Sequence, residues 1–304
     1  MKKCLPYIII LLLICNVAVA NDAVDPSWIG IVTIEGILVP IGTYNKDKWI
    51  NTWPEISIDE QPEVDKLARA TNDKMPLKYI PDLWKGPIKA IPTKLYLWSN
   101  EPIPKQLNVI DAEKYYSHCS VGWALKTDLQ PTKKVDYSPT PKIGVATNHK
   151  SNVIPFERLS KKNKLPLSLI KAIKAKFNGR TPIKLTNIYK ARNKVKEGDI
   201  YFIEAQQKYP HSDNTQSADC YNLNSLNSWV LLQGNKIKFL SSEFIATDCD
   251  GKETHDVVPN VVISVQGRYY VVSENYGYEW ESYMIHQLID DSMKEVLNVD
   301  GGGC

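Results

Sequence analysis

The stretch Ser228–Tyr283 contains two consecutive hairpin patterns, and the clearer one is Trp229-Val-Leu-Leu-Gln-Gly-Asn-Lys-Ile-Lys-Phe-Leu240. Gly234-Asn235 is a two-residue loop, and glycine at its first position suits a type II′ turn, whose twist matches that of paired strands. Pairing about this turn gives three facing pairs, Leu232 with Ile237, Val230 with Phe239, and Leu231 with Lys238. The first two pairs share one apolar face, so the pattern predicts a ribbon with a core side and a wetter side.

The second hairpin pattern pairs Val261–Val265 with Tyr269–Val272 about the turn Gln266-Gly267-Arg268. Both strands are apolar at successive positions, where a half-exposed strand would alternate. We therefore expect a strand pair that is covered on both faces and lies deeper in the sheet than the first hairpin.

Similar strand patterns recur towards the N-terminus. Trp28–Ile34 and Ile37–Tyr44 flank the turn Glu35-Gly36 and predict a meander at the head of the domain. Pro40 cannot donate to a strand ladder, so it indicates an edge or a bulge. Further short strands are expected at Ser120–Lys126, Lys142–Thr147 and Asp199–Ile203.

The fold class that these patterns predict is mainly β, because period-two apolar runs outnumber helical ones. Antiparallel hairpins and meanders would form a sandwich, a barrel or a propeller-like body, and no blade-length repeat decides among the three. The other expected features are short peripheral helices near 60–72, 166–178 and 288–297, a polar loop at Tyr209–Asn227 and a flexible tail at Asp300–Cys304.

The first 20 residues have the organisation of a secretory signal peptide. Met1-Lys-Lys3 supplies early positive charge, Tyr7–Cys15 is an uninterrupted apolar run, and Ala18-Val-Ala20 supplies the small residues of a cleavage site. Two alternatives are a retained anchor and a bacterial lipoprotein lipidated on Cys15, although Ile14 is bulky for the preceding position. We expect an exported protein, periplasmic or extracellular, with no membrane span after cleavage.

Cleavage would remove Lys2 and Lys3 and lower the formal net charge from +3 to +1. A nearly neutral chain has no bulk attraction for nucleic acid. The mature chain is expected to consist of an N-terminal β-rich part at 21–127, an exposed linker at 128–141 and a C-terminal β-rich part at 142–304. The two β-rich parts could also make one continuous domain.

Four cysteines remain after the leader, and an exported chain meets an oxidising compartment. Residues opposed about Gly234-Asn235 have numbers that sum to 469, as those of Cys220 and Cys249 do. We therefore predict a Cys220–Cys249 disulfide, on a count that a single bulge would break. Cys119 then pairs with Cys304 or stays free.

The sequence lacks the common motifs of metal and nucleotide chemistry. Its five histidines form no H-E-x-x-H, and it has no C-x-x-C, G-x-S-x-G or phosphate-binding glycine loop. Asp248–Asp256 resembles a calcium loop, but Lys252 and Glu253 stand where a ligand and a glycine are needed, which leaves an irregular site or a capped turn. We predict no cofactor and no metal, and the sequence leaves open whether the protein is an enzyme.

Arg158–Arg180 holds eight basic residues and an apolar stripe at helical spacing. Such a helix could lie on an anionic membrane surface. We favour a helix that docks on the domain with its lysines in solvent, because the stripe is short.

The main candidate for function is the aromatic and acidic run Tyr276-Gly-Tyr-Glu-Trp-Glu-Ser-Tyr283. Its candidate binding residues, with one acid from the preceding strand, are Glu274, Tyr276, Tyr278, Glu279, Trp280 and Glu281. Aromatic faces stack on sugars and acids accept hydrogen bonds from hydroxyls, which favours a glycan-binding surface. One alternative is simple packing of these aromatic residues in a final strand. Another is catalysis by Glu279 and Glu281, although paired acids normally come from separate elements.

These features favour a non-catalytic binding or structural module of the cell envelope, with a glycan or an envelope protein as its candidate partner. The alternative is an exported hydrolase that acts on a polysaccharide or a peptide. No feature of the sequence identifies the ligand or the partner.

Overall fold

The computed structural model describes residues 27–53, 74–75, 91–92, 94–99, 103–117, 120–130, 142–149, 153–160, 165–177, 182–210, 221–247 and 254–303. Strands make up 73% of the structure and helix 4%, so the predicted mainly β fold is confirmed.

Seventeen strands and one helix lie in these ranges. They are β1 (Trp28–Thr33), β2 (Ile37–Asn45), β3 (Lys48–Asn51), β4 (Lys74–Met75), β5 (Lys94–Trp98), β6 (Lys105–Ser117), β7 (Ser120–Thr127), β8 (Lys142–Thr147), β9 (Val153–Arg158), α3 (Leu167–Lys174), β10 (Ile183–Ala191), β11 (Asp199–Pro210), β12 (Tyr221–Gln233), β13 (Lys236–Thr247), β14 (Asp256–Val265), β15 (Arg268–Gly277), β16 (Trp280–Ile289) and β17 (Ser292–Gly303).

The first eight strands form a small barrel with two attached strands. Six strands pair in the order β1-β8-β5-β6-β7-β2, and β1 also pairs with β2, which closes the ring. The barrel interior is filled by buried apolar side chains, namely Trp28, Val32, Leu38, Leu95, Leu97, Leu107, Leu125 and Ala146. The bulge expected near Pro40 is present, because Gly30 pairs with Pro40 while Ile29 pairs with Gly42.

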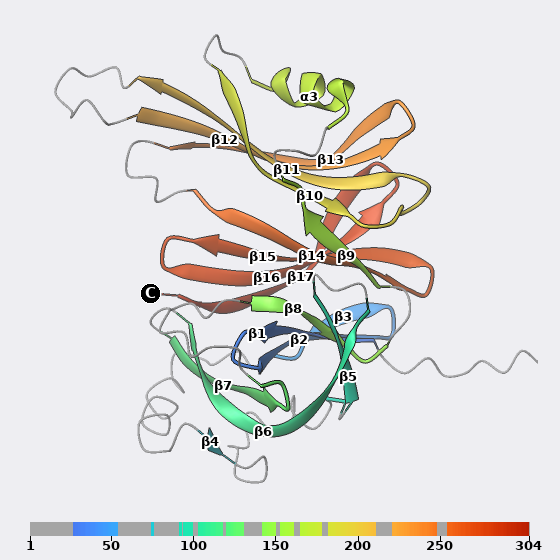
Figure 1. Cartoon of the computed structure of the whole chain (residues 1–304), viewed down its shortest axis with the longest axis vertical. Helices are drawn as coiled ribbons and strands as arrows, with labels where there is room; N and C mark the ends of the chain where they lie inside the picture. Colours follow the sequence, from blue (N-terminus) through green and yellow to red (C-terminus); the bar gives the residue numbers. More distant parts are fainter. Residues whose placement is uncertain are drawn as a thin grey trace, which may run out of the picture.

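The remaining nine strands form one antiparallel sheet in the order β13-β12-β11-β10-β9-β14-β15-β16-β17. Strand β9 joins its two halves, since Phe156–Arg158 pairs with β10 and Val153–Pro155 pairs with β14. The halves face each other across a shared apolar core that includes Phe202 and Trp229 from one half and Val262 and Val271 from the other. The sheet therefore doubles back on itself (Figure 1).

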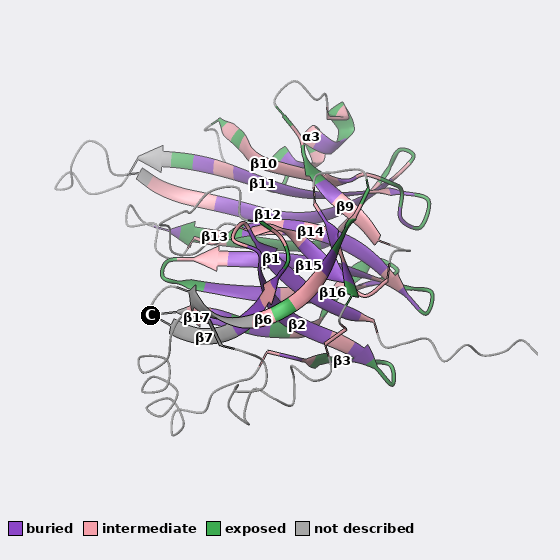
Figure 2. Ribbon diagram, turned by 60° about the horizontal axis from the view of Figure 1, so that its bottom comes forward, coloured by how far each residue is buried: buried purple, intermediate pink, exposed green. Residues whose placement is uncertain are grey.

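The molecule is thus a stack of layers, with α3 at one end and the barrel at the other (Figure 1). A core of buried side chains joins the barrel to β14–β17, and it includes Ile31, Val39 and Val145 from the barrel and Val261 and Ile285 from the sheet. Buried residues run through the middle of β14–β16, and exposed residues gather at the hairpin turns (Figure 2). Strands β14–β16 are therefore covered on both faces.

Helix α3 docks on the other side of the doubled sheet, as the sequence predicts. Leu169 and Ile173 are fully buried against Ile203 of β11 and Val230 of β12. The apolar stripe of the basic helix is therefore occupied by the protein's own sheet.

Both predicted hairpins are confirmed. Gln233 pairs with Lys236, and Gly234 has a φ of +58°, as a type II′ turn requires. In the second hairpin Val265 pairs with Arg268, so the loop is the two residues Gln266-Gly267, both with positive φ.

Three local predictions are wrong. Leu288–Val296 is a hairpin and not a helix, because Ile289 pairs with Ser292 about Asp290-Asp291. Asp300–Gly303 is not a tail but the end of β17. Both ends of the expected polar loop at Tyr209–Asn227 are β-strand, since β11 extends to Pro210 and β12 begins at Tyr221. The helix predicted near 60–72 lies outside the described residues.

The register behind the predicted disulfide shifts within the first hairpin. Val230 pairs with Phe239, but Trp229 pairs with Ser241, so a bulge at Leu240 moves every later pair by one residue. The count that opposed Cys220 to Cys249 is therefore wrong beyond this bulge. Both cysteines lie outside the described residues, and the disulfide itself stays a prediction.

Candidate functional site

The structure distributes the six candidate binding residues over two faces of the β15–β16 ribbon. Tyr270 and Val272 of β15 face the barrel, and strand alternation places Glu274 and Tyr276 on the same face. Glu281 lies on that face of β16 together with the buried Tyr283. The sequence predicts that the six residues form one surface. In the structure they are divided between a mostly buried group, Glu274, Tyr276 and Glu281, and an exposed turn.

The exposed turn carries the other three candidates. Tyr278 is 55% exposed, Trp280 is 37% exposed, and Glu279 has a φ of +60°. The indole of Trp280 covers Gly277, where an added Cβ would lie 1.9 Å from the indole Nε1. Trp280 is thus held at the turn by a glycine that leaves room for its ring.

An ion pair connects the buried group to the barrel. Lys142, at the start of β8, places its Nζ 2.6 Å from Oε2 of Glu281, and the two side chains are 5% and 0% exposed. The hydroxyl of Tyr283 donates to Oε1 of Glu281 at 3.1 Å. Both charged groups are buried away from water, so each is stabilised in the folded protein by the opposite charge of the other.

Glu274 is a second buried acid on the same face, and hydrogen bonds hold it in place. Asn260 donates through Nδ2 to Oε1 at 2.8 Å, and the Tyr276 hydroxyl donates to Oε2. Burial raises the pKa of Glu274 above its ordinary value, although Lys142 and the two hydrogen bonds act in the opposite direction. The fold therefore favours the protonated form of Glu274 more than water does.

These residues surround a cavity of about 340 Å³ between the barrel and the nine-stranded sheet, which we call the inter-sheet cavity. Its aromatic lining is Trp98, Phe156, Tyr189 and Tyr276, and its polar lining includes Lys142, Arg158, Asn260 and Glu274. Glu281 is not one of the lining residues but pairs with Lys142, which is. The cavity is of the size and mixed character that small-molecule sites have.

A second group of polar residues continues from the cavity along β9, β10 and β11. Arg158 donates to Oδ1 of Asn187, whose Nδ2 donates to the buried Glu204 at 2.5 Å. Burial also raises the pKa of Tyr189 and of Asp256, and Arg158 opposes the shift in both. Arg158 is therefore held among acids and does not act as an isolated positive charge.

Most of the cavity is not apparent from the sequence. The aromatic and acidic run indicates Glu274 and Tyr276, but no pattern indicates Lys142, Asn260, Arg158 or the aromatic residues of β5, β9 and β10. These residues are far apart in the chain and meet only because two sheets stack. The sequence feature that could have indicated the cavity is a charged residue within an apolar strand, such as Glu274 in β15.

The two acids weighed for catalysis, Glu279 and Glu281, do not meet in a cavity. Glu279 lies on the exposed turn, whereas Glu281 is buried in the ion pair. The acids that share a buried face are Glu274 and Glu281.

Among the described residues, no group of three or more His, Cys, Asp and Glu side chains is placed to hold a metal ion. Most of the calcium-like loop at Asp248–Asp256 lies outside those residues. Within the described ranges, no helix has the length and apolar character needed to cross a membrane.

Comparison of the chain with protein-family models, with curated proteins and with solved structures finds no match.

Proposed function

We propose that the protein is an exported, non-catalytic binding module of the cell envelope that holds a saccharide in the inter-sheet cavity. The observation that supports this most is the combination of four aromatic side chains with the buried acid Glu274 around one cavity of about 340 Å³. Sugars bind to such surfaces because their C–H faces pack on aromatic rings while their hydroxyls find acceptors and donors.

The charge balance of the cavity favours an uncharged, hydroxylated ligand. Lys142 is neutralised by Glu281 at 2.6 Å, and Arg158 lies among the acids Glu204 and Asp256. The cavity lining contains both hydrogen-bond donors and hydrogen-bond acceptors. A strongly charged ligand would lose its hydration in the cavity without meeting an isolated side chain of opposite charge, which is unfavourable.

The geometry favours binding over hydrolysis. Glycoside hydrolysis by paired acids needs two carboxyl groups on either side of the scissile bond. The Glu281 side chain is engaged by Lys142 and Tyr283 and is fully buried, so Glu274 is the one acid among the described residues that line the cavity.

A hydrolase that acts on a polysaccharide is the second candidate function. One observation favours it: the raised pKa of Glu274 is what a general acid requires. Glu274→Gln would abolish turnover by a hydrolase, whereas a binding module would show no turnover in either form.

The proposal includes three features of the exported chain: cleavage of a signal peptide after residue 20, location in the periplasm or outside the cell, and a disulfide bond between Cys220 and Cys249. The sequence of residues 1–20 supports the first two. Intact-mass analysis of the exported protein and non-reducing peptide mapping test them.

A panel of neutral and acidic oligosaccharides, titrated calorimetrically into the mature chain, tests the function. We expect Tyr276→Ala to abolish binding, because Tyr276 lines the cavity and donates to Glu274. Tyr278→Ala is the matched control, since Tyr278 lies on the exposed turn, and it should bind as wild type does. Equal loss in both variants, or no binding by wild type, would refute the proposal.

A further inference from the structure

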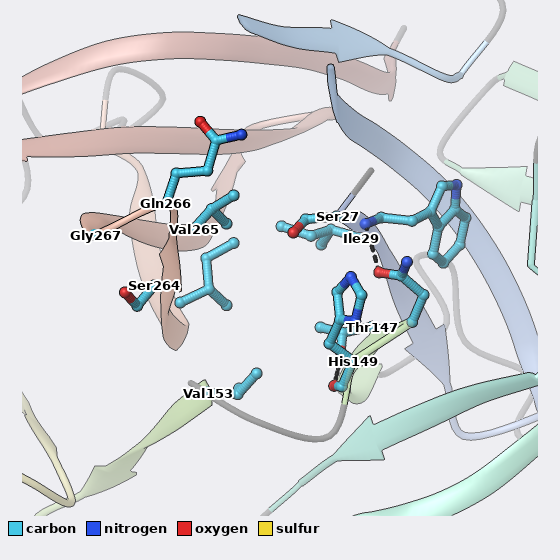
Figure 3. Close-up of a pocket in the computed structure, with 12 residues that line it drawn as sticks. Ser27, Ile29, Thr147, His149, Val153, Ser264, Val265, Gln266 and Gly267 are labelled. Atoms are coloured by element: carbon cyan, nitrogen blue, oxygen red, sulfur yellow. Dashed lines mark hydrogen bonds between the residues drawn. The ribbon is translucent and has the colours of Figure 1, made fainter. Parts of the chain in front are cut away.

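A second cavity, of about 350 Å³, lies between the same two layers and has a different lining. It is formed by the start of β1, the end of β8, the start of β9 and the end of β14 with its turn, and we call it the apolar cavity. Figure 3 shows Val153, Val265 and Ile29 around it, with His149 reaching in beside Thr147. Its volume is within the range of small-ligand sites.

Four aliphatic side chains form the apolar part of the cavity wall. Ile29, Ile263 and Val265 are buried members of the core between the barrel and the sheet, and Val153 packs against them. The polar residues of its lining include Ser27, Asn148, His149, Ser264 and Gln266. Among the described residues that line it, none is acidic and His149 alone can ionise.

Hydrogen bonds fix the barrel side of the cavity. The backbone N–H of Trp28 donates to Oδ1 of Asn148 at 2.8 Å, which joins β1 to the residues after β8 (Figure 3). The indole Nε1 of Trp98 donates to the Thr147 hydroxyl at 3.0 Å, and that hydroxyl donates to the carbonyl of His149 at 2.7 Å. These three bonds hold β1, β5 and the end of β8 together on that side, opposite β14.

The two cavities are separated along the strands they share. On β8, Lys142–Gly144 line the inter-sheet cavity and Thr147 lines the apolar cavity, while the buried Val145 lies between them. On β14, Val261 has the same position between Asn260 and Ile263. A ligand in one cavity need not enter the other.

We propose that the apolar cavity is a second ligand site, for a small compound whose aliphatic chain lies against Ile29, Val153, Ile263 and Val265. These four aliphatic side chains give an apolar chain a surface on which it is withdrawn from water. The polar rim fits one head group, a carboxylate or a hydroxyl, because no acid in the described lining would repel the first. This site goes beyond the proposed saccharide function and does not depend on it.

The test is calorimetric titration of the mature chain with octanoate and, separately, with 1-octanol. Val153→Phe places a ring in the apolar cavity and should weaken binding at least about tenfold, the equivalent of roughly two lost methylene contacts. Val258→Phe makes the same substitution in the inter-sheet cavity and is the matched control, with unchanged octanoate affinity expected. Val153→Leu, a smaller change, should give a smaller loss and replaces Val153→Phe if that variant does not fold.

Octanoate and octanol distinguish the two head groups. Similar affinity for both would show that the chain is recognised alone, and tighter binding of octanoate that is lost in His149→Gln would assign the carboxylate to His149. Both results support the site. It is overturned if wild type binds neither compound, if the Val153 variants bind as wild type does, or if Val258→Phe weakens binding as much as Val153→Phe.

Discussion

The two cavities have nearly the same volume and lie between the same layers, yet the described lining of one includes Lys, Arg and Glu side chains and that of the other includes none of these. The inter-sheet cavity is framed by a buried ion pair and a buried acid, Lys142 with Glu281 and Glu274. The apolar cavity is framed by aliphatic side chains and neutral hydrogen bonds. Strands β8, β9 and β14 contribute to both, so one end of each strand faces a polar site and the other an apolar one.

This difference shows how a stacked-sheet protein can hold two environments in one interface. Where the layers meet closely, Val145 and Val261 pack in the common core. At either end a cavity lies between the layers. The polar end depends on charge, so we expect it to be the more sensitive to single substitutions.

The largest effect is expected from Lys142→Met. This change leaves Glu281 buried without its partner, and breaking a buried pair in this way costs roughly 3–5 kcal/mol of unfolding free energy. Urea denaturation at pH 7 measures it. Lys238→Met is the matched control, because its partner Asp291 is 72% exposed, and it should leave stability nearly unchanged. Equal effects of the two changes would contradict the account of the polar end.

A smaller effect is expected from Thr147→Val at the apolar end. Valine has the same shape but cannot accept from Trp98 Nε1 or donate to the His149 carbonyl. Leaving these groups unpaired should cost about 1–3 kcal/mol, measured by the same denaturation. Octanoate binding should also weaken, since the frame of the cavity loosens. A variant as stable as wild type would show that the frame does not depend on these bonds.

Glu274→Gln should change how stability depends on pH. Burial raises the pKa of Glu274 in the folded state, so the folded protein holds this proton more tightly than the unfolded chain does. The stability that this provides is present below the unfolded pKa of about 4.5 and is lost as the pH rises through the higher pKa of the folded state. Glutamine has no such loss, so wild type should lose stability relative to Glu274→Gln as the pH rises above about 4.5. Urea midpoints for both proteins across this range measure the difference. Parallel curves would contradict the shift.

The smallest effect is expected from Trp280→Ala, which lies at the exposed turn and outside both cavities. Because the side chain is 37% exposed, the loss should be about 1 kcal/mol, below the roughly 3–5 kcal/mol of a buried tryptophan. Thermal melts decide this. If saccharide binding falls in this variant while stability holds, the ligand lies on the turn and not in the inter-sheet cavity.

The hairpins were predictable because their information is local. A two-residue loop such as Gly234-Asn235 sets both the turn and the register beside it. The bulge at Leu240 was not predictable, because it depends on how β12 and β13 pack within the doubled sheet. The hairpin at Asp290-Asp291 was missed because apolar residues on either side of it happen to have helical spacing.

The candidate site was predictable only in part. Glu274 and Tyr276 were recognisable as polar residues next to an apolar strand. Their burial could not be predicted, because it depends on which face of β15 is covered by the barrel, and sequence spacing does not give this. Lys142 belongs to a strand more than 130 residues away from its partner Glu281, and only the stacking of barrel on sheet brings them together.

The most direct test of the central claim is a crystal structure of the mature chain with the tightest saccharide from the panel. The account predicts the sugar in the inter-sheet cavity, with a ring packed on Trp98 or Tyr276 and a hydroxyl within hydrogen-bond distance of Glu274. A sugar bound at Tyr278 and Trp280, with the inter-sheet cavity empty, would contradict it.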